Sequence, residues 1–366
     1  MRKRGAACLL IGWTTWLRAE DPADFPIRLP KWINEFTLRT GGGYRDNVGL
    51  SAHSPQESPF ILTGAEAILL RLPEHNTRFN VFLSADDLRF LSGGTVDKEQ
   101  TAFAQAMVAR DWGSGWQASL AVEYVYQNQV LDVSTTEPGL TTLPVEGHGI
   151  ILRDEIRHNF GSNYWVSLEL LAKRQFFRQP LDDYWEYGPR IILGRSYGHK
   201  SELSVSYEIE ERPYDDEELR LADGTPVPGT RRTSLLQAAR FTWKHYWDAQ
   251  NHWRTSTRLA ASQNEDNGSG YFDFTRIQAG EQILFRTENW DISAEARATR
   301  YNYPVQTGTD LAKRRVSELL FTFRCERRVA RFLKLSAEYE YNRVISNLEP
   351  EQYTVNTVKG ALNWVF

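Results

Sequence analysis

The side chains best suited to chemistry in this sequence are acidic and basic residues that recur at every second or fourth position. Charges of this kind lie in three neighbouring segments: Glu208, Glu210, Arg240, Lys244, Arg254 and Arg258. In an extended strand, residues two or four positions apart point to the same side. Charged side chains that line one wall tune selectivity among small ions and solutes. We therefore predict that these six residues form a selectivity patch.

A second group of charges follows the same spacing near the end of the chain. Its members are Lys334, Glu338, Glu340 and Lys359. Two interpretations of all these charges stay open at this point. They can line an aqueous pore, or they can satisfy one another through ion pairs between neighbouring strands and so close a polar interior.

Motifs for catalysis are absent from the sequence. It contains no GxSxG elbow, no HExxH, no P-loop and no paired cysteine spacing. Gly113-Ser114-Gly115 and Gly268-Ser269-Gly270 are glycines of a turn and a loop around a serine, not nucleophile elbows. We expect the histidines to be solvated or interfacial: His53, His75, His148, His158, His199, His245 and His252. We predict neither an enzyme nor a cofactor.

Two acidic runs, at 214–218 and 264–268, could bind Ca²⁺ or bridge lipopolysaccharide through divalent ions. Their spacing does not match a calcium loop, so we expect solvated loops and no metal site. The net charge of −4 and the pI near 6.0 give no reason to propose nucleic acid as a partner.

Long segments of alternating polarity position the charges. In 201–210, Leu203, Val205, Tyr207 and Ile209 share one face and Glu208 and Glu210 share the other. Strands of ten or more residues exceed the five or six that are usual in soluble sheets and suit a tilted crossing of a bilayer. We predict sixteen strands, near 31–42, 58–72, 77–87, 99–112, 116–129, 147–160, 164–177, 184–197, 201–213, 231–246, 252–263, 270–285, 290–303, 312–326, 331–345 and 351–366.

Composition favours one membrane β-barrel. Mean hydropathy is −0.51, yet 13% of the residues are aromatic. Such a balance fits strands that face lipid with every second residue and carry aromatic girdles at both interfaces. Short connections alternate with long ones, which predicts short periplasmic turns and longer extracellular loops in an antiparallel up-and-down barrel. The connections 130–146 and 214–230 are the best candidates to fold inward and narrow the pore. We expect 40–48, with its three glycines, to be a flexible transition from strand to loop.

The chain begins with a pattern typical of export. Residues 1–19 combine a basic start, a short apolar stretch and small residues before Glu20, which predicts a secretory signal peptide. We assign 20–30 to a periplasmic segment and 31–366 to the barrel. Cys8 would leave with the signal, so Cys325 could form no intramolecular disulfide.

The last strand carries a family resemblance. Leu362, Trp364 and Phe366 lie on one face, and a chain that stops on an aromatic in this way resembles bacterial outer-membrane β-barrel proteins of the porin-like type. The closing hairpin, from Tyr339 to Phe366, is similar to that of surface-lipoprotein-assembly-modifier barrels. Those barrels follow a periplasmic repeat domain, which we do not expect here because 20–30 alone is assigned to the periplasm. The resemblance implies an outer-membrane location, contact with lipid and lipopolysaccharide, and recognition of the three residues by periplasmic chaperones and barrel-assembly machinery.

Three functions remain under consideration. The first is a channel for small hydrophilic solutes or ions, which we prefer. The second is a barrel that exports polysaccharide or lipoprotein with a periplasmic partner, and the third is an outer-membrane hydrolase. An outward row of small residues, Ala294, Ala296 and Ala298, would permit packing in a homo-oligomer and equally suits contact with lipid.

Overall fold

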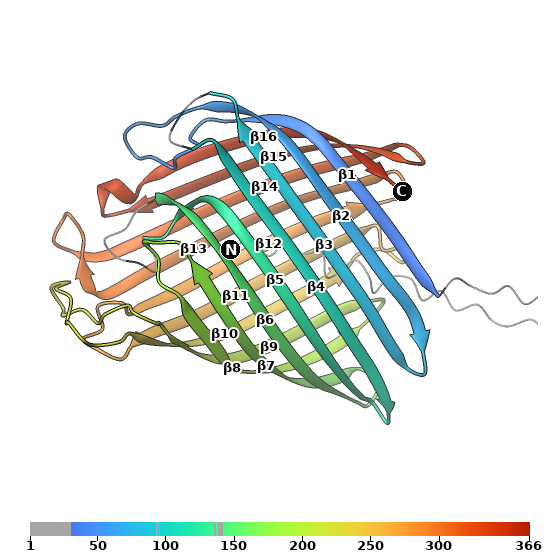
Figure 1. Cartoon of the computed structure of the whole chain (residues 1–366). Helices are drawn as coiled ribbons and strands as arrows, with labels where there is room; N and C mark the ends of the chain where they lie inside the picture. Colours follow the sequence, from blue (N-terminus) through green and yellow to red (C-terminus); the bar gives the residue numbers. More distant parts are fainter. Residues whose placement is uncertain (1–30, 93, 95, 135–136, 138–141) are drawn as a thin grey trace, which may run out of the picture. The chain divides into compact units, whose positions relative to one another are not determined.

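A computed structural model describes residues 31–92, 94, 96–134, 137 and 142–366. The signal peptide and the periplasmic segment predicted for 1–30 lie outside these residues. The described part forms one closed antiparallel barrel in which each strand pairs with its sequence neighbours, and β1 pairs with β16 (Figure 1). The prediction of a sixteen-stranded up-and-down barrel is confirmed. No helix within the described ranges is long and apolar enough to cross a membrane.

The strands are β1 (Trp32–Arg45), β2 (Ser58–Glu74), β3 (Thr77–Phe90), β4 (Lys98–Gly113), β5 (Trp116–Asp132), β6 (Thr142–Phe160), β7 (Tyr164–Phe177), β8 (Tyr184–Tyr197), β9 (Ser201–Pro213), β10 (Thr233–Tyr246), β11 (Trp253–Asp266), β12 (Phe274–Arg286), β13 (Trp290–Thr307), β14 (Lys313–Ala330), β15 (Leu333–Ser346) and β16 (Tyr353–Val365). A 3₁₀ turn, Glu349–Glu351, precedes β16.

The two ends of the barrel differ as the sequence predicts. Tight connections join the strands at one end, the turn end, where Gly113, Ser114 and Gly115 all have positive φ angles. Glycine reaches that region without steric cost, which is why it recurs in such turns. The longer connections gather at the other end, the loop end, and the longest is 214–232.

The transition from strand to loop falls within the predicted range 40–48, but later than the glycines. Gly41, Gly42 and Gly43 lie within β1, where each is paired on one side with β2 and on the other with β16. Their smallness serves close packing, because a Cβ on Gly41 would lie 2.1 Å from the carbonyl oxygen of Gly360. The strand therefore continues to Arg45, and the connection starts at Asp46.

The outer face of the barrel is apolar. Leucine, isoleucine and valine side chains stand exposed along the middle of the strands, with Ile277 62% exposed. Exposed aromatic side chains flank them toward the turn end: Trp112, Trp116, Phe160, Tyr164, Trp247, Trp253 and Trp290. A continuous apolar band between interfacial aromatics is the surface that a lipid bilayer requires.

The buried apolar residues lie inside the barrel in two clusters. The first contains Val48, Phe60, Leu62, Phe90, Val96 and Val130. The second contains Phe274, Tyr303, Val316, Val344, Tyr353 and Val355. Leu50, from the connection between β1 and β2, packs against both clusters, so that connection folds inward.

Glycine also makes room inside the barrel wall. The indole of Trp165 on β7 fills the space beside Gly194 on β8, where a Cβ would lie 2.1 Å from Cε2 of the ring. The guanidinium of Arg157 lies 4.0 Å from the centre of the same ring.

Candidate functional site in the barrel lumen

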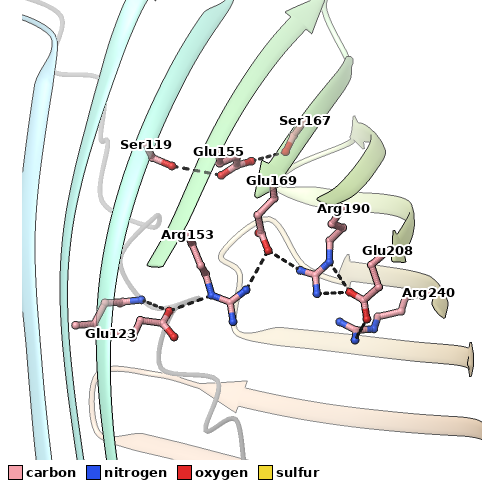
Figure 2. Close-up of polar contacts among 10 residues, drawn as sticks. Ser119, Glu123, Arg153, Glu155, Ser167, Glu169, Arg190, Glu208 and Arg240 are labelled. Carbon is pink, nitrogen blue, oxygen red and sulfur yellow. Dashed lines mark hydrogen bonds and ion pairs between the residues drawn. The ribbon is translucent and has the colours of Figure 1, made fainter. Parts of the chain in front are cut away.

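A row of polar side chains, six of them charged, crosses seven consecutive strands on the inner wall (Figure 2). We call it the charge ladder, and it consists of one residue from each of β4 to β10: Gln105, Glu123, Arg153, Glu169, Arg190, Glu208 and Arg240. Acidic and basic groups alternate along it, so each guanidinium lies between two carboxylates or ends the row.

The ladder distances are those of direct ion pairs. Arg153 lies 3.4 Å from Glu123 and 3.0 Å from Glu169. Arg190 donates to Glu169 at 3.1 Å and to Glu208 at 2.7 Å. A guanidinium presents several N–H groups in a fixed planar fork, which lets it bridge two carboxylates.

Glu208 is the most enclosed member of the ladder. Its side chain is 1% exposed and accepts hydrogen bonds from both Arg190 and Arg240. Period-2 alternation on β9 turns Glu208 and Glu210 inward while Tyr207 and Ile209 face outward, where both are exposed. A carboxylate buried on a barrel wall needs such partners, because an unpaired buried charge is costly.

The other ion pairs of the strands also run along the wall. Arg258 on β11 lies 3.6 Å from Glu295 on β13, and Lys359 on β16 lies 2.9 Å from Glu338 on β15. Lys334 pairs at 3.1 Å with Glu326 on β14, a residue that the sequence argument did not select. The alternation of residues 312–326 could have indicated Glu326, but not that it lies beside Lys334.

All ten predicted pore-lining residues thus lie on lumen-facing positions, six on β9 to β11 and four on β15 and β16. Glu208 and Arg240 belong to the ladder, and Glu338 and Lys359 form a local pair. The ladder members Arg190 and Glu169 were missed, since their alignment depends on the register between strands. The role of the ten residues in selectivity stays a prediction.

One sector of the wall carries cations in excess. On the lumen faces of β10, β11 and β12 the basic residues include Arg240, Lys244, Arg254, Arg258 and Arg276. The carboxylate on that side is Asp266, at the loop end, and it accepts backbone N–H groups of Gly268, Gly270 and Phe272. Glu281 on β12 faces outward, where it accepts a hydrogen bond from Thr257.

Three of these cations contact neutral groups. Arg254 donates to the amide oxygen of Gln282 at 3.0 Å, and Arg276 donates to the hydroxyl of Ser262 at 3.0 Å. The amine of Lys244 lies 5.4 Å from the ring centre of Tyr246. In this sector the hydrogen bonds of Arg254 and Arg276 and the ring contact of Lys244 go to neutral groups, while Glu202 on β9 lies opposite Lys244 in the strand register.

The described start of the connection between β5 and β6 reaches into the lumen at the loop end. The carbonyl oxygen of Ser134 accepts a hydrogen bond of 2.9 Å from Arg314 on β14. Eight strands separate β5 from β14 around one side of the barrel and six around the other, so the two are almost opposite. The prediction that this connection folds inward is met at its described residues.

Arg314 is held firmly at that position. Its side chain is 1% exposed, lies 2.7 Å from Glu351, and donates to Gln306 at 2.9 Å. The ring centre of Tyr303 lies 4.3 Å from its guanidinium carbon. A second buried arginine, Arg232, contacts the same connection through Glu137 at 3.1 Å.

The connection 214–232 contains the second segment, 214–230, that the sequence offers as a candidate to fold inward. Asp215 pairs with Arg174 on β7, and the backbone N–H of Glu217 donates to Asp182 in the β7–β8 connection. The Arg174 guanidinium that donates to Asp215 lowers the pKa of that carboxyl. Arg232, the last residue of this connection, contacts Glu137 of the β5–β6 connection and shares its guanidinium with Glu217.

The acidic runs hold no metal centre in the part of the chain that the structure describes, where no group of three or more His, Cys, Asp or Glu residues is placed to bind an ion. The carboxylate of Asp266 instead organises its own loop. Several histidines lie among aromatic rings of the outer face. The ring centres of His158 and Trp116 are 4.4 Å apart, and those of His245 and Trp247 are 4.5 Å apart.

Comparison with known proteins identifies the fold. No family model and no curated protein matches the sequence. OccAB1 of Acinetobacter baumannii is similar with a TM-score of 0.50 and 10% identity over 92% of this chain and 96% of that one. A BenF-like porin from Pseudomonas fluorescens Pf-5 is similar with a TM-score of 0.50 and 9% identity, over 92% of this chain and 100% of that one. A bacterial polysaccharide outer membrane secretin has a TM-score of 0.44 and 10% identity, over 90% of this chain and 98% of that one.

At these identities the two likenesses with a TM-score of 0.50 concern the fold alone. The barrel described above is built like the solved barrels of OccAB1 and the BenF-like porin.

Proposed function

We propose that the protein is an outer-membrane channel for small hydrophilic solutes or ions. The observation that carries this proposal is the direction of its ion pairs. Those of the strand region join neighbouring or nearby strands along the wall, as the ladder does from β5 to β10. Charges paired in this way leave the axis of the barrel to solvent, and barrels of sixteen strands are wide enough to hold an aqueous channel.

The sign of the remaining charge supports a preference for anions. Lys244, Arg254 and Arg276 contact neutral groups on one sector of the wall. Fixed charges of one sign raise the local concentration of counter-ions in a narrow passage. We therefore infer that small anions pass more readily than cations.

The apolar outer band and its aromatic flanks support insertion into the outer membrane with the turn end in the periplasm. In this orientation the loop end faces the surface and contacts lipopolysaccharide, and Leu362, Trp364 and Phe366 are available to chaperones and the assembly machinery. We infer no enzymatic activity. A homo-oligomer through the row of Ala294, Ala296 and Ala298 stays a proposal.

Conductance of the refolded protein in planar bilayers tests the function. We expect steady conductance and, under a salt gradient, a reversal potential that indicates anion preference. Changing Arg240 and Arg258 to glutamine should reduce that preference, whereas Arg300→Gln, on the outer face of β13, should leave it unchanged. A folded barrel that conducts no current would contradict the proposal.

A further inference from the structure

Three arginine side chains stand on the outer face of the barrel near its loop end, on the consecutive strands β13, β14 and β15. They are Arg300, Arg315 and Arg343, and all three are exposed. Their direction follows from the alternation of the strands, because Arg315 lies between the buried residues Arg314 and Val316, which face the lumen. We call the three residues the arginine patch.

The height of the patch on the barrel wall follows from the geometry of the strand. Trp290, an exposed aromatic residue of the turn end, lies ten residues before Arg300 on the same strand. A strand that rises about 3.4 Å per residue and is tilted by about 40° climbs about 26 Å over that length. The apolar band of such barrels is about 25 Å tall. Arg300 therefore lies where the band ends on the loop side.

The other two side chains lie close enough to Arg300 to share a ligand with it. Arg315 is the register partner of Asn302, two residues beyond Arg300. Arg343 lies in the row of Ala298, two residues before Arg300. At about 4.8 Å between strands, the Cα atom of Arg300 lies about 8 Å from that of Arg315 and about 12 Å from that of Arg343. Long arginine side chains at these spacings can converge on one anionic group or on two groups of one molecule.

The strands of the patch supply no carboxylate to their outer face within the described ranges. Arg300 donates to the amide oxygen of Asn302 at 3.3 Å. None of the three guanidinium groups forms an ion pair with a described residue. The carboxylates of β13 to β15 lie on lumen-facing positions: Asp291, Glu295, Glu318, Glu326, Glu338 and Glu340.

The carboxylates that surround the patch do not neutralise it either. Asp310, in the connection between β13 and β14, accepts a hydrogen bond from the amide of Asn347. Glu349, in the turn before β16, forms no ion pair with the patch in the described part of the chain. Glu281, on the outer face of the neighbouring β12, accepts a hydrogen bond from Thr257.

Other outward cations near the loop end differ from the patch because they have carboxylate partners. Arg89 on β3 lies 2.7 Å from Asp87. Arg174 on β7 donates to Asp215 at 2.9 Å. The sector of β13 to β15 therefore presents guanidinium groups whose charge stays available to a ligand at the border of the membrane.

We propose that the arginine patch binds the phosphate groups of lipopolysaccharide. Guanidinium groups present N–H donors in a planar fork that matches phosphate oxygens. Lipopolysaccharide carries phosphates where its acyl chains meet water, which is the height worked out for Arg300. Toward the turn end, Leu319 and Phe321 continue the outer face with exposed fractions of 43% and 37% and offer the acyl chains an apolar surface. This inference rests on the orientation given with the proposed function, in which the loop end faces the cell surface.

Titration of fluorescently labelled lipopolysaccharide with the refolded protein in detergent tests the patch. We expect Arg315→Gln and Arg343→Gln each to weaken binding about fivefold, the loss typical of one basic side chain at an anionic lipid surface. Lipopolysaccharide without its phosphate groups should bind the wild type more weakly than the intact molecule. Arg89→Gln is the matched control, because it removes the same charge from the outer face at a place where Asp87 already neutralises it. It should bind as the wild type does.

Equal affinities of the wild type and both patch variants would overturn the proposal. An equal loss in Arg89→Gln would also overturn it, since that result indicates a general attraction between charges. Phosphatidylglycerol that competes as well as unlabelled lipopolysaccharide would overturn the assignment to lipopolysaccharide. Conductance in bilayers without lipopolysaccharide reports the channel independently, because the patch faces away from the lumen. Specific binding by a protein that conducts no current would refute the channel and keep the patch.

Discussion

Replacing Glu208 with glutamine removes one negative charge from the middle of the charge ladder while nearly preserving the shape of the side chain. Arg190 keeps Glu169 at 3.1 Å, but Arg240, whose side chain is 35% exposed, loses the carboxylate that it contacts. The wall therefore gains one positive charge that solutes can sense. The variant should favour anions more strongly than the wild type.

The size of the effect follows from Coulomb's law. An ion that passes about 6 Å from a unit charge in water interacts with it by about 0.7 kcal/mol. A screening length of about 10 Å at 0.1 M salt reduces this to about 0.4 kcal/mol, and one of about 30 Å at 0.01 M leaves about 0.6 kcal/mol. The anion is stabilised and the cation destabilised by this amount, so the two energies add in the permeability ratio. The ratio of anion to cation permeability should rise about three- to fourfold at the higher salt concentration and about sevenfold at the lower one.

Reversal potentials of single channels under salt gradients, at these two concentrations, measure the change. The control is Glu211→Gln, on the same strand but facing outward, where its carboxylate lies near Tyr187. A reversal potential that does not move in a folded, conducting Glu208→Gln protein would refute the assignment of the ladder to the conducting path.

Two further predictions concern packing and assembly. Gly194→Ala places a methyl group about where the Trp165 ring lies, so it should cost about 1–3 kcal/mol in equilibrium unfolding followed by tryptophan fluorescence. Gly280→Ala, whose Cβ would come no closer than 3.6 Å to another atom, is the control, and equal stabilities would contradict the packing argument. Deleting Phe366 should lower the amount of protein in outer-membrane fractions, and normal levels of heat-modifiable, inserted protein would count against its role as an assembly signal.

Most of the fold could be predicted because lipid imposes a pattern that each strand shows by itself. Tyr207 and Ile209 alternate with Glu208 and Glu210 within a few residues, so a local window suffices to orient β9. The bounds of the strands were less predictable at the loop end, where β6 starts at Thr142 and β13 extends to Thr307. Where a strand extends beyond the bilayer, backbone hydrogen bonding alone continues it. The alternation of polar and apolar side chains then no longer marks where the strand ends.

The ladder and the crossing of the lumen could not be predicted in this way. Alternation turns Arg190 inward, but only the pairing of β8 with β9 sets it opposite Glu208. The contact of Ser134 with Arg314 joins residues 180 positions apart, through a backbone carbonyl that has no signature in the sequence. Such contacts depend on the closure of the barrel as a whole.

An aqueous pore and a closed polar interior predict different effects of changing Glu208 and Arg240. The ladder contains three carboxylates and three guanidinium groups and is neutral as a unit, so its net field is weak at a distance. If the pairs served only to fill the interior, Glu208→Gln and Arg240→Gln would both lower stability and neither would alter selectivity. If the ladder lines the path of solutes, the two changes must shift the reversal potential in opposite directions, because one adds and the other removes a positive charge at nearly the same place. The sign of the shift, and not the loss of stability, is therefore the measurement that separates a channel from a closed barrel.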